Sequence, residues 1–249
     1  MRLCGLLVGL MAMTGCATSQ PMGGALFSSN YTYNPLTPVA APPAPLDEVA
    51  APSPARTRAV RPPPPDAREQ VLATARGLVG NPSVKVSGRT WPADCTGFVE
   101  AVYSRAGVSF RGEAVSGDNG VTAFYRYARA HGRVFTRGTP QPGDLVFFRE
   151  TYDRNRDGRR NDGLTHVGLV DEVLADGTVT VIHRVQRGVV RYRMNLARKD
   201  VRRDARTGLV LNDMLRAPGG GQVPVLTGQL FAAYGSVLPA PAPTSLARR

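Results

Sequence analysis

The stretch WPADCTGFV, residues 91–99, carries the feature on which the interpretation of the whole chain rests. Beyond it, apolar residues recur at helical spacing: Phe98, Val99, Val102, Tyr103 and Ala106. This period predicts a helix that ends near Gly107 and has Cys95 at its N-terminus or just inside it. Unpaired N–H groups and the helix dipole stabilise a thiolate there, so we expect a lowered pKa for the Cys95 thiol. The backbone N–H of Cys95 can also help to hold an oxyanion.

The other two cysteines of the chain, Cys4 and Cys16, lie near the N-terminus. Arg2 supplies a positive charge, and residues 3–13 form an apolar run that is shorter than the roughly 20 residues a membrane span needs. A charged start followed by a short apolar run is typical of a secretory signal. Cys4 would be removed with this signal.

Residues 13–16, MTGC, resemble the lipobox of bacterial lipoproteins. In that family the cysteine is acylated and becomes the first residue of the mature protein, which implies a lipid on Cys16. Ala17 in the next position implies sorting to the outer membrane. The alternative is a signal peptide that contains a cysteine by chance. With Cys16 lipidated, Cys95 is a lone thiol in a secreted protein, and this favours a reactive cysteine over a buried apolar one.

Composition divides the rest of the chain. Twelve of the 21 prolines fall between Pro21 and Pro65, in a stretch without helical or strand period. We therefore predict that residues 17–65 form a disordered tether, which as a random coil would span roughly 40 Å. Residues 66–238 are long enough for one catalytic domain. The Pro- and Ala-rich residues 239–249 are predicted to be a disordered tail.

The net charge of +12 lies mostly in residues 66–249, which hold 27 Arg and Lys against 17 Asp and Glu. Nine of these basic residues fall between Arg184 and Arg206. Such a surface attracts polyanions, including the acidic polymers of a cell envelope, unless it is simply solvated. We expect no nucleic-acid partner, because no nucleic-acid-binding motif accompanies the charge.

Three motifs together carry a family resemblance. Residues 94–99, DCTGFV, resemble the D-C-[ST]-G-[FL]-[VI] signature of the NlpC-type cell-wall peptidases, which are papain-like. Residues 142–148, PGDLVFF, and residues 165–170, THVGLV, resemble two further segments of that family, in the same order. The resemblance covers about residues 66–235. It implies an α+β fold in which the cysteine helix packs on a central antiparallel β-sheet that carries the histidine.

The same resemblance assigns roles. His166 would be the base that takes the proton of Cys95, and His183 would fill the third catalytic position on the next strand, where it fixes the tautomer of His166. The hairpin between them raises a geometric problem. If residues 176–177, Asp-Gly, form a two-residue turn, His183 pairs with Val170 and lies roughly 13 Å along the strand from His166. Either a bulge or a different loop closes this gap, or Gln186 orients His166 instead.

Three residues near the cysteine are candidates for positioning the substrate or the oxyanion: Asp94, Thr96 and Trp91. Trp91 is included because the family often has a tyrosine before the cysteine, where this chain has Ser83. The third histidine, His131, lies in the last turn of a predicted helix just before Gly132. A cationic ring at a helix C-terminus is stabilising there, so we assign His131 a structural role.

Residues 153–163, DRNRDGRRNDG, contain oxygen-bearing side chains at alternate positions followed by glycine, as at the start of an EF-hand loop. The ligands of a looser calcium loop would be Asp153, Asn155, Asp157, Asn161 and Asp162. Leu164 occupies the position of the usual bidentate glutamate, so this is not an EF-hand. The competing interpretation is a solvated turn. Calcium would here be structural, and no cofactor is needed for the chemistry.

Three further elements are predicted. Residues 66–79 read as a helix with Asp66 as its N-cap, residues 188–194 as a strand, and residues 226–238 as a closing helix or strand.

The resemblance implies a lipid-anchored cysteine endopeptidase that hydrolyses peptidoglycan stem peptides between D-glutamate and diaminopimelate. Its partners would be peptidoglycan and the membrane that holds the lipid, and its location the outer membrane, facing the periplasm. Two alternatives remain open. One is an amidase or acyltransferase that uses the same site, and the other is a catalytically silent lipoprotein that binds the wall.

Overall fold

The structure, a computed structural model, describes residues 67–216 and 224–240. All of them belong to the unit Thr57–Arg249. The predicted signal, the lipid site Cys16, the tether 17–65, the cap Asp66 and most of the tail lie outside the described residues and stay predictions. No helix in the described part of the chain is both long and apolar enough to span a bilayer.

Six strands form the main sheet, in the order β3-β10-β4-β5-β6-β7, and each neighbouring pair is antiparallel. Their bounds are Arg133–Phe135 (β3), Leu145–Arg149 (β4), Leu164–Val173 (β5), Val179–Val185 (β6), Gly188–Met194 (β7) and Phe231–Ser236 (β10). β5, which carries His166, lies between β4 and β6.

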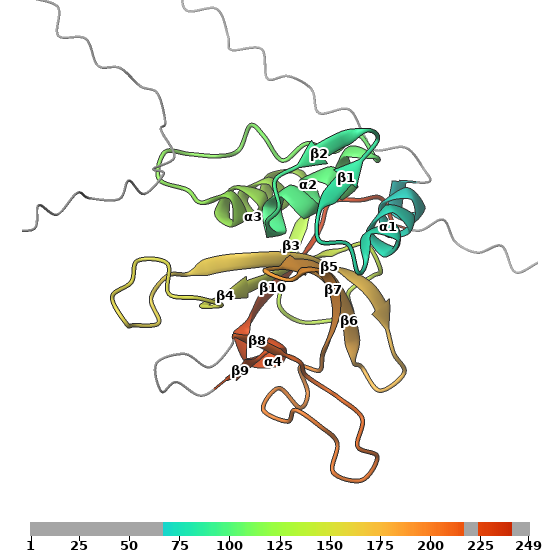
Figure 1. Cartoon of the computed structure of the whole chain (residues 1–249), viewed down its shortest axis with the longest axis vertical. Coiled ribbons are helices and arrows are strands. Elements are labelled where there is room, and N and C mark those ends of the chain that lie inside the picture. The colour runs from blue at the N-terminus through green and yellow to red at the C-terminus, as the bar shows by residue number, and fades with distance from the viewer. Residues whose placement is uncertain (1–66, 217–223, 241–249) are drawn as a thin grey trace, which may run out of the picture. The chain divides into compact units, whose positions relative to one another are not determined.

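Further elements lie on both sides of this sheet (Figure 1). On one side are α1 (Ala67–Leu78), α2 (Cys95–Ser104), α3 (Gly120–His131) and the hairpin of β1 (Val84–Val86) and β2 (Arg89–Trp91). On the other are α4 (Thr227–Leu230) and the short pair β8 (Met214–Arg216) and β9 (Val225–Leu226). Helices combined with a mostly antiparallel sheet make this an α+β fold.

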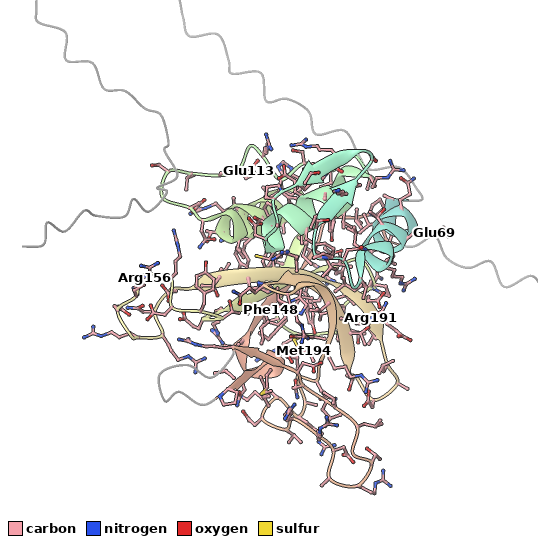
Figure 2. All side chains as sticks on the ribbon, in the orientation of Figure 1. Glu69, Glu113, Phe148, Arg156, Arg191 and Met194 are labelled. Carbon is pink, nitrogen blue, oxygen red and sulfur yellow. The ribbon has the colours of Figure 1, made fainter. Side chains whose placement is uncertain are left out.

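Alternation along the strands divides the interior into two cores. On the helical side, Val167 and Leu169 of β5 and Ile182 of β6 pack with the apolar faces of α1, α2 and α3. On the other side, Phe148 and Met194, both labelled in Figure 2, belong to a second core that includes Leu230 of α4. Because both faces of the sheet are covered, the central strand β4 reads as a continuous apolar run over residues 145–148.

The helix predicted from the cysteine motif is confirmed: α2 begins at Cys95. Asp94 is its N-cap, and its carboxylate accepts hydrogen bonds from the backbone N–H of Gly97 and the hydroxyl of Thr96, both at 2.7 Å. Glycine at position 97 is required for a separate, steric reason. A Cβ atom at this position would lie 2.2 Å from the carbonyl oxygen of Pro92, so only glycine lets the incoming chain cross the first turn.

Other predictions from the sequence also hold. The strand predicted at residues 188–194 is β7, with the same bounds. The closing segment contains both of the expected alternatives, since the short helix α4 runs directly into β10. The described part of the predicted first helix is α1, which ends at Leu78, two residues before Gly80 adopts a left-handed φ of 89°.

The hairpin between β5 and β6 differs from the predicted one. Its loop is residues 174–178, closed by a hydrogen bond from the Leu174 N–H to the Thr178 carbonyl, so a two-residue turn is wrong. A β-bulge between Val170 and Glu172 then shifts the register once more. Together the longer loop and the bulge move β6 by two positions relative to the predicted pairing, because Leu169 now pairs with Ile182.

The new register brings the two histidines together. One step beyond the Leu169–Ile182 pair, His183 lies beside Gly168, two residues from His166 rather than four. A Cβ atom on Gly168 would lie only 2.9 Å from the Cβ atom of His183. The glycine therefore leaves the space in which the His183 side chain approaches β5.

The extra residue of the bulge, Asp171, is 3% exposed and holds two arginines. The Nε atom of Arg76 on α1 lies 2.6 Å from one carboxylate oxygen, and the Nε atom of Arg191 on β7 lies 2.6 Å from the other. Arg191 is labelled in Figure 2. The bulge that sets the register of the two histidines is thus linked by ion pairs to α1 and to the edge strand β7.

We expect Asp171→Asn to lower the free energy of unfolding by about 2 kcal/mol, because it removes the charge from a buried carboxylate with two ionic hydrogen bonds. Both arginines are about half exposed, which keeps the loss below that of a fully buried pair. Urea unfolding measures this. The matched control is Glu100→Gln, which breaks a surface pair with Arg111 and should cost less than about 0.5 kcal/mol. Equal losses in the two variants would contradict the prediction.

Candidate active site

Cys95 and His166 line one open cleft of about 710 Å³ at the ends of the central strands. Asp94 and Cys95 come from the start of α2, and Thr165 and His166 come from β5. The backbone N–H of Val167, the residue after His166, interacts with the Cys95 sulfur. The N-terminus of α2 and the first half of β5 therefore meet at the cysteine.

Burial raises the pKa of the Cys95 thiol to about 11. The charge of Asp94 acts in the same direction, while the backbone N–H groups of Val167, Cys95 and Thr96 favour the thiolate. The lowered pKa expected from the helix N-terminus is therefore wrong, because the loss of hydration outweighs the N–H groups. The cysteine rests as a neutral thiol and needs a base in order to react.

This pKa has a measurable consequence. Alkylation of Cys95 by iodoacetamide should keep accelerating as the pH rises from 9 to about 11, because only the thiolate reacts. In urea-unfolded chain the rate should level off above about pH 8.5, the ordinary range of a cysteine. Mass spectrometry of the peptide that contains Cys95 separates it from the other two cysteines. A folded-state rate that levels off at or below pH 8.5 would contradict the raised pKa.

His166 and His183 form a directly bonded pair. The Nε2 atom of His166 lies 2.7 Å from the Nδ1 atom of His183, and the two rings meet edge to face. His166 is 8% exposed and His183 is fully buried. Burial lowers the pKa of the His166 imidazole to about 4. Burial, the charge of His166 and the charge of Arg187 lower the pKa of His183 well below its usual value.

Both imidazoles are therefore neutral near pH 7, and one must donate to the other. If His166 donates its Nε2–H, its Nδ1 atom keeps a lone pair and can accept a proton. The opposite tautomer places a hydrogen on Nδ1 of His166 and removes that base. The Nε2 atom of His183 is buried and has no partner among the described residues, while the ring of Tyr192 packs edge-on with centroids 4.6 Å apart.

Gln186, the other candidate for orienting His166, is exposed at the rim of the cleft. Within the described residues no hydrogen bond joins it to His166. The geometry therefore favours His183 as the residue that holds the base.

The other candidate residues from the sequence lie in different places, and only some of them line the cleft. Asp94 lines the cleft, and Thr96 is tied to it as part of the helix cap. Trp91 is half-buried on β2 against the helical core, under the guanidinium of Arg89 at 4.0 Å, and is not among the described residues that line the cleft. His131 ends α3 as predicted, where it lies 2.8 Å from Glu113.

Comparison with known protein families gives one match. Residues 84–184 match the family model of the CHAP domain. The match covers 101 of the 249 residues, so it identifies a CHAP-type segment within this chain. CHAP domains are papain-like cysteine peptidase or amidase domains of cell-wall hydrolases. No curated protein matches the chain.

The matched range contains Cys95, His166 and His183, so all three lie within the CHAP domain. The match supports the papain-like class expected from the sequence and a hydrolase in general terms, with peptidoglycan as the implied substrate. The narrower NlpC-type assignment and the lipid anchor are not tested and stay predictions.

The predicted calcium loop projects from the CHAP domain between β4 and β5, with Arg156 exposed at its tip (Figure 2). Its oxygen atoms accept hydrogen bonds from the loop itself: Asp153 from the Gly158 N–H, Asp157 from the Asn161 amide, and Asp162 from the backbone N–H groups of residues 154 and 155. Among the described residues no group of three or more His, Cys, Asp or Glu is arranged to hold a metal. Calcium binding stays a prediction, which calorimetric titration with calcium would test.

Sequence reasoning missed the walls of the CHAP cleft. Arg184, Arg187 and Tyr192 line it from β6 and β7, while Tyr152 and Met214 line it from the loop after β4 and from β8. The sequence indicated Arg184 and Arg187 only as members of the basic run between Arg184 and Arg206. No sequence signal singles out Arg184, because strand alternation predicts that it points to the face opposite His183.

Proposed function

We propose that this CHAP domain hydrolyses the stem peptides of peptidoglycan with Cys95 as nucleophile, His166 as base and His183 as the residue that orients the base. The observation that carries the proposal is the 2.7 Å contact between His166 and His183 at a cleft that Cys95 also lines.

The raised thiol pKa defines the first step. Because Cys95 is a neutral thiol, the attack on the substrate carbonyl is coupled to transfer of its proton to Nδ1 of His166. His183 accepts the Nε2–H of His166 and so stabilises both the reactive tautomer and the imidazolium that forms. The backbone N–H of Cys95, at the start of α2, is the proposed donor to the oxyanion.

The second half restores the enzyme. The imidazolium of His166 gives its proton to the leaving nitrogen as the tetrahedral intermediate collapses, the C–N bond breaks, and the amine departs from a thioester on Cys95. A water molecule then attacks the thioester carbonyl while His166 takes one of its protons. Collapse of that intermediate breaks the carbon–sulfur bond, returns the proton to the thiolate and releases a carboxylic acid.

We place the scissile bond between D-glutamate and diaminopimelate and the lipid on Cys16, with residues 17–65 as tether from the outer membrane into the periplasm. The motif resemblances support these finer assignments. An amidase acting at the sugar–peptide junction, or an acyltransferase, would use the same residues.

The experiment is a digestion of isolated cell-wall fragments by the full chain, with the products identified by mass spectrometry. A new amino terminus on diaminopimelate is the expected product. Release of whole stem peptides would identify an amidase instead, and products heavier than the starting fragments a transferase. If no product forms, the hydrolase proposal fails and a silent wall-binding protein replaces it.

His131→Ala is the matched control for this digestion, because it alters a histidine on α3 that pairs with Glu113 outside the cleft lining. It should digest the fragments at the rate of the native chain.

A further inference from the structure

Two arginines at the cleft have no acidic partner in the described part of the chain. Arg184 of β6 and Arg187 of the following turn line the cleft, and neither forms a salt bridge there. Elsewhere on the same sheet Arg191 is paired with Asp171. Asp94, the one described carboxylate in the cleft lining, is occupied by its helix cap. The cleft therefore carries positive charge that the described protein does not neutralise.

Arg184 is held in place by main-chain carbonyls. Its Nη1 atom donates to the carbonyl of Val185 at 2.8 Å, and its Nη2 atom donates to the carbonyl of Pro82 at 3.1 Å. The side chain is half-buried, and its Nε atom is buried without an acceptor among the described residues. These two hydrogen bonds fix the orientation of the guanidinium. Its terminal nitrogens still carry further N–H groups that can donate to a ligand. Such an arginine binds a planar carboxylate at low entropic cost.

Arg187, which is exposed, adds a second positive charge to the cleft. Its Nη2 atom donates to the hydroxyl of Tyr192 at 3.1 Å, and its guanidinium lies 5.6 Å from the centre of that ring. Tyr192 in turn packs against His183. The basic side of the cleft is therefore continuous with the proposed catalytic pair.

The opposite side of the cleft has a different character. In the sheet order β4-β5-β6-β7, β4 and β6 lie on opposite sides of β5, which carries His166 (Figure 1). The residues that follow β4 and the two arginines of β6 and its turn therefore come from opposite neighbours of that strand. There the aromatic side chain of Tyr152 is 52% exposed and lines the cleft. A substrate with one anionic half and one less polar half matches this division.

We infer that the cleft selects substrates bearing a free carboxylate on the side of the scissile carbonyl that faces β6 and β7, and that Arg184, assisted by Arg187, binds it. This inference rests on the proposed function. In stem peptides the carboxylate nearest the proposed bond is the α-carboxylate of D-glutamate, which exists in matched form as a carboxamide.

The test compares two stem-peptide fragments that differ only in this group, carboxylate against carboxamide. The native full chain should cleave the carboxylate form with a kcat/KM at least about 10-fold higher, the range of one charge-assisted hydrogen bond. Arg184→Gln should reduce this preference to about 3-fold or less, and Arg184→Lys should restore part of it. Arg187→Gln, an exposed position, should reduce the preference by about 3-fold without a change in melting temperature.

Arg129→Gln, an exposed arginine on α3, is the charge-matched control and should keep the native preference. Equal cleavage of the two fragments by the native chain would overturn the inference while leaving the proposed function standing. A loss of rate in Arg184→Gln that is the same for both fragments would also overturn it.

Binding separates failure of the inference from failure of the proposed function. If the native chain cleaves neither fragment, the proposed function fails, and calorimetric titration of both fragments into Cys95→Ala still tests the selection. Tighter binding of the carboxylate form, lost in the double variant with Arg184→Gln, would support it. Equal binding would overturn it.

Discussion

Replacing Cys95 by alanine is expected to abolish release of peptides from cell-wall fragments, with kcat lowered by at least about 10⁴-fold. The proposed mechanism has no second nucleophile. Water alone cannot replace the positioned sulfur, and without the sulfur no acyl-enzyme forms. Fragment binding should persist, since the cleft walls are unchanged. The measurement is initial rate at saturating substrate, followed by mass spectrometry.

The loss must be separated from unfolding, because Cys95 packs against the helical core. The melting temperature of Cys95→Ala should fall by only a few degrees, the shift expected for about 1 kcal/mol. A well-folded variant that still releases the same peptides would show that another residue is the nucleophile.

Replacing His183 by alanine is expected to lower kcat by about 10² to 10⁴-fold, the range seen when the orienting member of a catalytic triad is changed. Without His183, the Nε2–H of His166 loses its acceptor, and the reactive tautomer is no longer favoured. KM should change much less, because His183 is fully buried and does not reach the substrate.

His183→Asn separates orientation from packing, because its amide oxygen can occupy nearly the place of Nδ1 and accept the same hydrogen bond. It should recover a substantial part of the activity lost in the alanine variant. Gln186→Ala is the matched control and should stay within a few-fold of the native kcat. A large loss there, with a small loss in His183→Ala, would identify Gln186 as the orienting residue instead.

Local patterns were sufficient to predict the elements that carry the site. The start of α2 at Cys95 followed from helical spacing, and β7 followed from its apolar residues and its flanking turn. These features depend on neighbours in the sequence. The α+β class and the papain-like assignment followed from three short motifs in a fixed order.

What the sequence could not supply depends on contacts between distant segments. The histidine register needs the bulge at Asp171, which is held by arginines from α1 and β7. The thiol pKa depends on how deeply Cys95 is buried, and here burial outweighs the helix N-terminus. The substrate-binding role inferred for Arg184 became visible only when the structure showed a guanidinium fixed by carbonyls and left without an acid.

The hairpin between β5 and β6 also constrains how this chain can change by insertion and deletion. The longer loop and the bulge each shift the register by one position, and a shift of one position alone would turn His183 to the opposite face of the sheet. Surface loops normally tolerate changes in length. The loop of residues 174–178 does not have this freedom, because losing one of its residues would leave the two imidazoles on opposite sides of the sheet unless the bulge changed at the same time.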